Sequence, residues 1–83
     1  QIFRFAEQFG LDDTLLREMM SLHLNEENIN EFGRFDKLKA SANMDKVKEY
    51  FETSTGEKLS IFKARSKFDN LLRSFIINNG FDL

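Results

Sequence analysis

The chain has 83 residues, enough for one domain with one modest hydrophobic core, and its formal net charge at pH 7 is −2. It contains no cysteine, which excludes a thiolate metal site. Its apolar runs all fall short of the roughly 20 residues that a membrane-spanning helix needs.

The charges are unevenly distributed along the chain. Residues 1–31 carry 2 basic and 7 acidic side chains, whereas residues 58–83 carry 5 basic and 2 acidic ones. This pattern is consistent with complementary charges inside the fold, with a polarised surface for a partner, or with ordinary solvated helix faces. Because the chain begins with Gln1 and its apolar pattern starts at Ile2, we expect residues 1–83 to be a single domain excised from a larger protein.

Two helices are predicted in the first third of the chain. The first covers residues 2–9, with a glycine, Gly10, where a helix-terminating residue belongs. The second starts after an N-cap at Asp12 or Asp13. Its apolar face comprises Leu15, Leu16, Met19, Met20, Leu22 and Leu24. The polar residues 25–28 predict a connection or a new helix start, since Asn25 and Asn28 are both suitable caps.

The stretch NINEFGRFDKLKA, residues 28–40, has an apolar residue at every third position and a glycine, Gly33, inside the run. One interpretation is that Gly33 ends a helix and a new turn starts at Arg34. The other is that Gly33 lets a neighbouring helix pack closely while Phe32 and Phe35 point into the core. A spacing of three drifts around a 3.6-residue helix, which favours the break. In either case, residues 36 and 39, an aspartate and a lysine, are spaced to form an ion pair.

Two more helices are predicted in the remainder. Ser41 and Asn43 are cap candidates for a helix whose apolar face comprises Met44, Val47, Tyr50 and Phe51. Residues 53–56, TSTG, predict a loop ending at Gly56.

After a cap at Ser60, a helix of about five turns is expected to end at Asn79 and Gly80. Its apolar stripe comprises Ile61, Ala64, Phe68, Leu71, Leu72, Phe75 and Ile76. The predicted fold class is therefore all-α, a compact bundle of four to five helices with the long C-terminal helix at its centre.

No pattern in the chain predicts catalysis. The four glycines stand alone, outside any phosphate-binding loop, and the one histidine, His23, is expected to be a partly buried or boundary residue. Asp36 with the segment DKVK at residues 45–48 only faintly resembles a metal-nuclease pattern, because Asp45 lies in the predicted first turn of a helix. We therefore predict no catalytic, cofactor-binding or metal-binding residue here.

Basic residues gather on the last helix and its approach, residues 58–73. The candidate contacts for DNA or for a partner are Lys63, Arg65, Lys67 and Arg73. At about 100° per residue, three of them lie broadly opposite the apolar stripe and Arg65 lies nearer its flank. They form either a solvated face or a weak accessory DNA contact, since backbone phosphates attract clustered positive charge.

Residues 28–40, together with VKEYFE at 47–52 and TGEKLSIFKARSKFDNLLRSFI at 55–76, resemble the C-terminal helical domain of type I restriction enzyme R subunits. These are the motor subunits of bacterial restriction-modification complexes, and the resemblance covers residues 11–76. It implies a cytoplasmic parent, an ATP-dependent type I site-specific deoxyribonuclease that uses ATP and magnesium. Its nuclease and helicase-like domains precede the helical region, and none of their catalytic motifs lies in these residues.

The resemblance implies a non-catalytic module from the C-terminal region of the parent. Such a module docks the R subunit onto the methyltransferase core, and its partners are the methyltransferase and specificity subunits or the parent's own helicase domains. The alternative from a different class is a small helical nucleic-acid-binding module that uses the basic face of residues 58–73. A third possibility is a purely internal structural domain without a partner.

Overall fold

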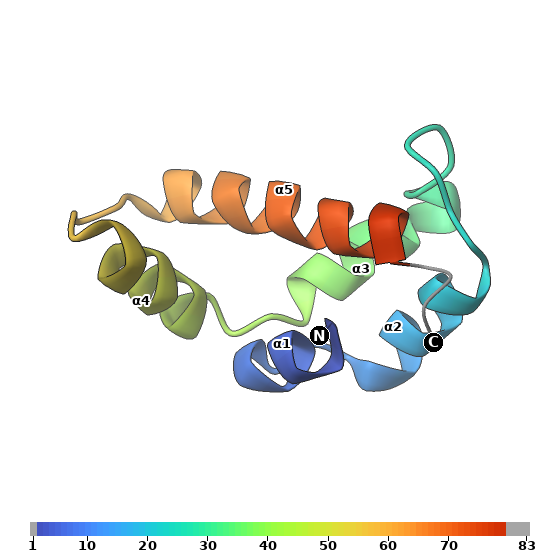
Figure 1. The fold of residues 1–83 in the computed structure, drawn as a ribbon, viewed down its shortest axis with the longest axis horizontal. Helices are drawn as coiled ribbons and strands as arrows, with labels where there is room; N and C mark the ends of the chain where they lie inside the picture. The colour runs from blue at the N-terminus through green and yellow to red at the C-terminus, as the bar shows by residue number, and fades with distance from the viewer. Residues whose placement is uncertain (1, 80–83) are drawn as a thin grey trace.

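The computed structural model describes residues 2–79, and the described part contains helices and no strand (Figure 1). The elements are α1 (Ile2–Phe9), α2 (Asp13–Ser21), the 3₁₀ helix η1 (Glu31–Gly33), α3 (Arg34–Ala40), α4 (Met44–Thr55) and α5 (Ile61–Asn79). The predicted all-α class is confirmed. Gly80, at the predicted end of the last helix, lies outside the described residues.

The predicted caps set several of the helix boundaries. The carboxylate of Asp12 accepts a hydrogen bond from the Leu15 N–H at 3.0 Å, which makes Asp12 the N-cap of α2. Asn43 caps α4 in the same way. Ser41 instead accepts a hydrogen bond from the Asp12 N–H at 2.9 Å, which ties the start of α2 to the end of α3.

The long helix α5 runs along the long axis of the molecule and packs antiparallel to α4, with α1, α2 and α3 covering the rest of its length (Figure 1). The core contains side chains from all five α-helices. Its aromatic centre joins α1 to α5: the Phe68 ring lies 5.7 Å from that of Phe5 and 5.6 Å from that of Phe9, centroid to centroid. The expected central position of the last helix is thus confirmed.

The predicted loop at residues 53–56 is wrong, because α4 continues to Thr55 and only Gly56 leaves the helix. The hydroxyls of Ser54 and Thr55 donate to the carbonyls of Tyr50 and Phe51, each at 2.9 Å. These bonds satisfy the polar side chains within the helix, so the segment has no need to unwind. Gly56 then ends the helix in a left-handed conformation, at φ +74°.

Three residues placed on apolar faces by the sequence are instead exposed. Leu22 is 46% exposed because α2 ends at the preceding residue, so Leu22 leaves the apolar face of the helix. Ile61, the first residue of α5, is 36% exposed at the end of the helix. Tyr50 is 37% exposed, although its ring still packs edge-on against Phe9 with the centroids 5.3 Å apart.

Gly33 marks a helix break, as one of the two interpretations predicted. It has φ +71° and α3 begins at Arg34. The close-packing interpretation is wrong, since a β-carbon at Gly33 would meet nothing within 4 Å. Phe32 is also left-handed, at φ +59°, and it is 76% exposed instead of pointing into the core. Two consecutive left-handed residues turn the chain so sharply that Phe32 faces solvent while Phe35 is buried.

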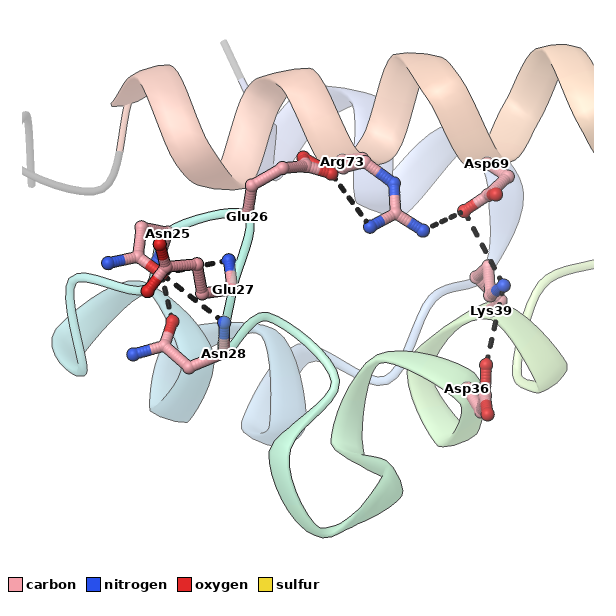
Figure 2. Close-up of polar contacts among 8 residues, drawn as sticks. All are labelled: Asn25, Glu26, Glu27, Asn28, Asp36, Lys39, Asp69 and Arg73. Atoms are coloured by element: carbon pink, nitrogen blue, oxygen red, sulfur yellow. Dashed lines mark hydrogen bonds and ion pairs between the residues drawn. The ribbon is translucent and has the colours of Figure 1, made fainter.

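The polar residues 25–28 form a connection rather than a new helix. The Asn25 N–H donates to the Asn28 side-chain oxygen at 2.7 Å, and the Asn28 N–H donates to the Asn25 side-chain oxygen at 3.2 Å (Figure 2). The two side chains thereby satisfy the backbone of a tight turn. Buried Leu24 and Ile29 anchor the two ends of the turn to the core.

Candidate interaction surface

Five charged side chains form a continuous row between the loop after α2, the helix α3 and the helix α5 (Figure 2). We call this row the charged seam; its members in order are Glu26, Arg73, Asp69, Lys39 and Asp36. Arg73 lies 3.0 Å from Glu26 and 3.3 Å from Asp69, N to O. The Lys39 ammonium lies 3.4 Å from both Asp69 and Asp36. The charges alternate in sign, so each cation joins two elements of the fold.

The charged seam lies against the buried ring of Phe35, which is 1% exposed. The Arg73 guanidinium carbon and the Lys39 ammonium nitrogen each lie 4.8 Å from the centroid of this ring. Both cations therefore contact the negative face of an aromatic ring as well as their carboxylate partners. This placement gives the seam a structural role and leaves Arg73 and Lys39 little freedom to bind a ligand.

One carboxyl group of the seam has a shifted pKa. The Asn30 amide donates to Asp36 Oδ2 at 3.1 Å, and the Asp36 N–H donates back to Asn30 Oδ1 at 3.1 Å. The hydrogen bond from Asn30 lowers the pKa of Asp36 below its ordinary value, and the hydrogen bond from Lys39 lowers it further. The Asn30–Asp36 pair also closes the base of the turn that carries Phe32.

The structure separates the four candidate contact residues. Arg73 belongs to the charged seam. Lys63 and Lys67 lie four residues apart on one side of α5, are exposed, and have no ion pair within residues 2–79. Arg65 faces a different side, where it lines an open cavity of about 370 Å³ with Lys39, Ala40, Met44 and Phe68. The predicted basic face therefore reduces to a pair of lysines.

Within residues 2–79, the residues considered for chemistry belong to three different segments: His23 follows α2, Asp36 lies in α3 and Asp45 lies in α4. His23 lies exposed just after α2 at φ +51°, not partly buried. Asp36 belongs to the seam, whereas Asp45 lies in the first turn of α4. Among the described residues, no three histidine, aspartate or glutamate side chains gather as metal ligands would. None of the helices described has the length and apolar character needed to cross a bilayer.

Two exposed phenylalanines, Phe32 and Phe62, were not among the predicted contact residues. Each is 76% exposed. Phe62 falls outside the apolar stripe of α5, a signal that the sequence already carries. Phe32 gives no comparable signal, because its spacing from Ile29 and Phe35 matches that of core residues. The two belong to η1 and to the start of α5, which lie toward opposite ends of the long axis (Figure 1).

The chain was compared with known protein families, with curated proteins and with solved structures, and it matches none of them. The surface described above and the resemblance that covers residues 11–76 are therefore the basis for a functional proposal.

Proposed function

We propose that this chain is a non-catalytic helical interaction and assembly module of a type I restriction enzyme R subunit. In this role it docks the ATP-dependent DNA translocase and endonuclease subunit onto the methyltransferase core in the cytoplasm. The observation that carries the proposal is Phe32, an aromatic side chain that is 76% exposed on the turn before α3 in a chain that buries most of its other large apolar side chains. Exposed aromatic side chains are the residues that protein interfaces favour.

Under this proposal the chemistry belongs to other parts of the parent. ATP and magnesium act in the helicase-like and nuclease domains, and DNA sequence specificity belongs to a separate subunit. The contribution of this chain is a rigid helical surface. The shared core of α1 and α5 and the charged seam support rigidity, because they tie together elements that are distant in the sequence.

The direct test is calorimetric titration of the chain into the purified methyltransferase and specificity subunits encoded beside the parent gene. A 1:1 complex that persists as the salt concentration rises supports docking. Absence of binding, with retention of the chain on duplex DNA, contradicts it.

A second candidate function, a small helical nucleic-acid-binding module, is favoured by Lys63 and Lys67, which are exposed and form no ion pair within residues 2–79. Binding through phosphates weakens steeply as salt rises, and substituting both lysines with glutamate weakens it further. The formal net charge of −2 opposes this function, because DNA is itself strongly negative.

A further inference from the structure

The turn that carries Phe32 combines an exposed aromatic ring with a strained backbone. Phe32 has φ +59° and ψ +20°, a conformation that side chains with a β-carbon rarely adopt. The side chain of Phe32 gains no burial from this conformation, since it is 76% exposed. Strained backbone positions cluster at functional sites.

The base of this turn is held by a dense set of hydrogen bonds. The Gly33 N–H donates to the Asn30 carbonyl at 2.9 Å, and the Glu31 N–H donates to the Asn28 carbonyl at 3.0 Å. The reciprocal pair of Asn30 and Asp36 closes the turn from the other side. Buried Ile29 fixes it to the core. The backbone of Phe32 is therefore set before any partner arrives.

The ring of Phe32 is also oriented by its neighbours. The Arg34 guanidinium carbon lies 5.2 Å from the centroid of the Phe32 ring. The same guanidinium forms an ion pair with Glu18 on α2, with Nε 2.8 Å from Oε1. The ring is thus connected through Arg34 to a second helix. An aromatic ring and an arginine presented in a fixed arrangement are typical of the residues that dominate binding energy at interfaces.

The charges beside Phe32 indicate the chemistry of its partner. Glu31, the residue directly before Phe32, is exposed and has no ion pair in the described part of the chain. Arg34 is neutralised by Glu18. The uncompensated charge directly next to Phe32 in the chain is therefore the carboxylate of Glu31, and a surface that matches it is apolar in the middle and basic at its rim.

We propose that Phe32 is the anchor residue of the docking surface and that it inserts into an apolar pocket bordered by lysine or arginine side chains on the methyltransferase core. This inference rests on the proposed docking function. It adds the anchor residue and the loop of this chain that make the contact, and the charge of the partner's surface. Glu31 contacts the basic rim, and Arg34 holds the ring in its binding orientation.

Phe62 supplies a matched control for this proposal, because it is the same residue type with the same exposure, 76%. The chain and its Phe32→Ala and Phe62→Ala variants are titrated into the methyltransferase and specificity subunits encoded beside the parent gene. We expect Phe32→Ala to weaken binding at least about tenfold and Phe62→Ala to leave the affinity within about twofold. Circular dichroism verifies that both variants keep the helical fold.

The charge of the surface is tested separately with Glu31→Lys. This variant should slow association and reduce the affinity most at low salt, with the difference shrinking above about 0.3 M salt as screening increases. A Glu31→Lys variant that binds as tightly as the unmodified chain at low salt contradicts the basic rim.

The outcomes distinguish this proposal from the docking function itself. If the chain binds and Phe32→Ala binds equally well, docking stands and Phe32 is not its anchor. If the unmodified chain does not bind the methyltransferase core, the docking function fails and this inference fails with it. If Phe32→Ala instead abolishes a concentration-dependent dimer of the chain in sedimentation experiments, the occupant is a second copy and the assigned partner is wrong.

Discussion

Arg73 on α5 donates a hydrogen bond from its guanidinium to the Glu26 carboxylate at 3.0 Å, joining two positions that lie 47 residues apart. The same guanidinium contacts Asp69 and the face of the Phe35 ring. One side chain therefore connects the last helix to the loop after α2 and to the core beneath it. Arg73 is therefore a structural residue, and its loss should destabilise the fold.

Replacing Arg73 with alanine should lower the free energy of unfolding by about 1 to 2 kcal/mol, because two partly exposed ion pairs and a cation–π contact disappear together. Urea denaturation followed by circular dichroism measures the change. Arg73→Lys is the matched control, since it keeps the charge but loses the two-pronged geometry of the guanidinium. Its free energy of unfolding should lie between those of the original chain and the alanine variant. An alanine variant as stable as the original chain would show that the seam contributes nothing.

The lowered pKa of Asp36 should make the free energy of unfolding fall at acid pH. Hydrogen bonds from Asn30 and then from Lys39 lower the pKa of Asp36 in the folded state below its ordinary value of 3.8. The unfolded chain therefore binds this proton more readily than the folded chain. The contribution is fully present above the ordinary pKa and is lost as the pH falls through the lowered value.

The measurement is the urea midpoint from about pH 7 down to about pH 2 for the original chain, Asp36→Asn and Asn30→Ala. Asp36→Asn should remove this part of the acid sensitivity, and Asn30→Ala should reduce it by removing the largest cause of the shift. Identical acid profiles for all three proteins would count against the hydrogen bonds as its origin.

The sequence predicted the parts of the structure that depend on local patterns. The caps at Asp12 and Asn43 and the break at Gly33 follow from residues within a few positions of each helix end. The Asp36–Lys39 ion pair was likewise expected, because residues three apart on a helix are neighbours. These features need no knowledge of how the helices pack.

The features of the candidate surface depend instead on the tertiary fold. The contact of Arg73 with Glu26 joins residues that lie 47 positions apart in the sequence, and no local spacing indicates it. Phe32 has the spacing of a core residue and turns outward only because two consecutive residues adopt left-handed conformations. A periodic pattern identifies which residues can share a face, but it does not determine the backbone conformation at a single position.

The strain at Phe32 is measurable by comparing two substitutions that both remove the ring. Glycine accepts φ +59° without cost, whereas alanine keeps the β-carbon that makes this conformation unfavourable. Phe32→Gly should therefore be more stable than Phe32→Ala by about 1 kcal/mol in urea denaturation. The reverse order would mean that the left-handed conformation carries no strain. Neither result depends on the identity of the partner.

Substitutions in the aromatic centre of the core should lower the free energy of unfolding more than the other substitutions considered. Phe68 is 1% exposed and contacts the rings of Phe5 and Phe9. Phe68→Ala should cost about 3 to 5 kcal/mol, which approaches the whole stability of a small domain. Phe62→Ala, six residues earlier on the same helix, should change stability by less than about 0.5 kcal/mol. Equal effects at both positions would contradict the observed packing of α5.

The two candidate functions differ in which cations of α5 they need. Lys63 and Lys67 are exposed and unpaired within residues 2–79, whereas Arg73 is engaged by Glu26 and Asp69. If the chain binds DNA, Lys63→Glu with Lys67→Glu should abolish retention on a short duplex at low salt, and Arg73→Gln should leave most of it. If the chain is a docking module that uses Phe32, the double lysine variant should bind the methyltransferase core as the original chain does. Fluorescence anisotropy on the duplex and calorimetry on the protein partner, applied to the original chain, the double lysine variant and Arg73→Gln, therefore distinguish the two functions.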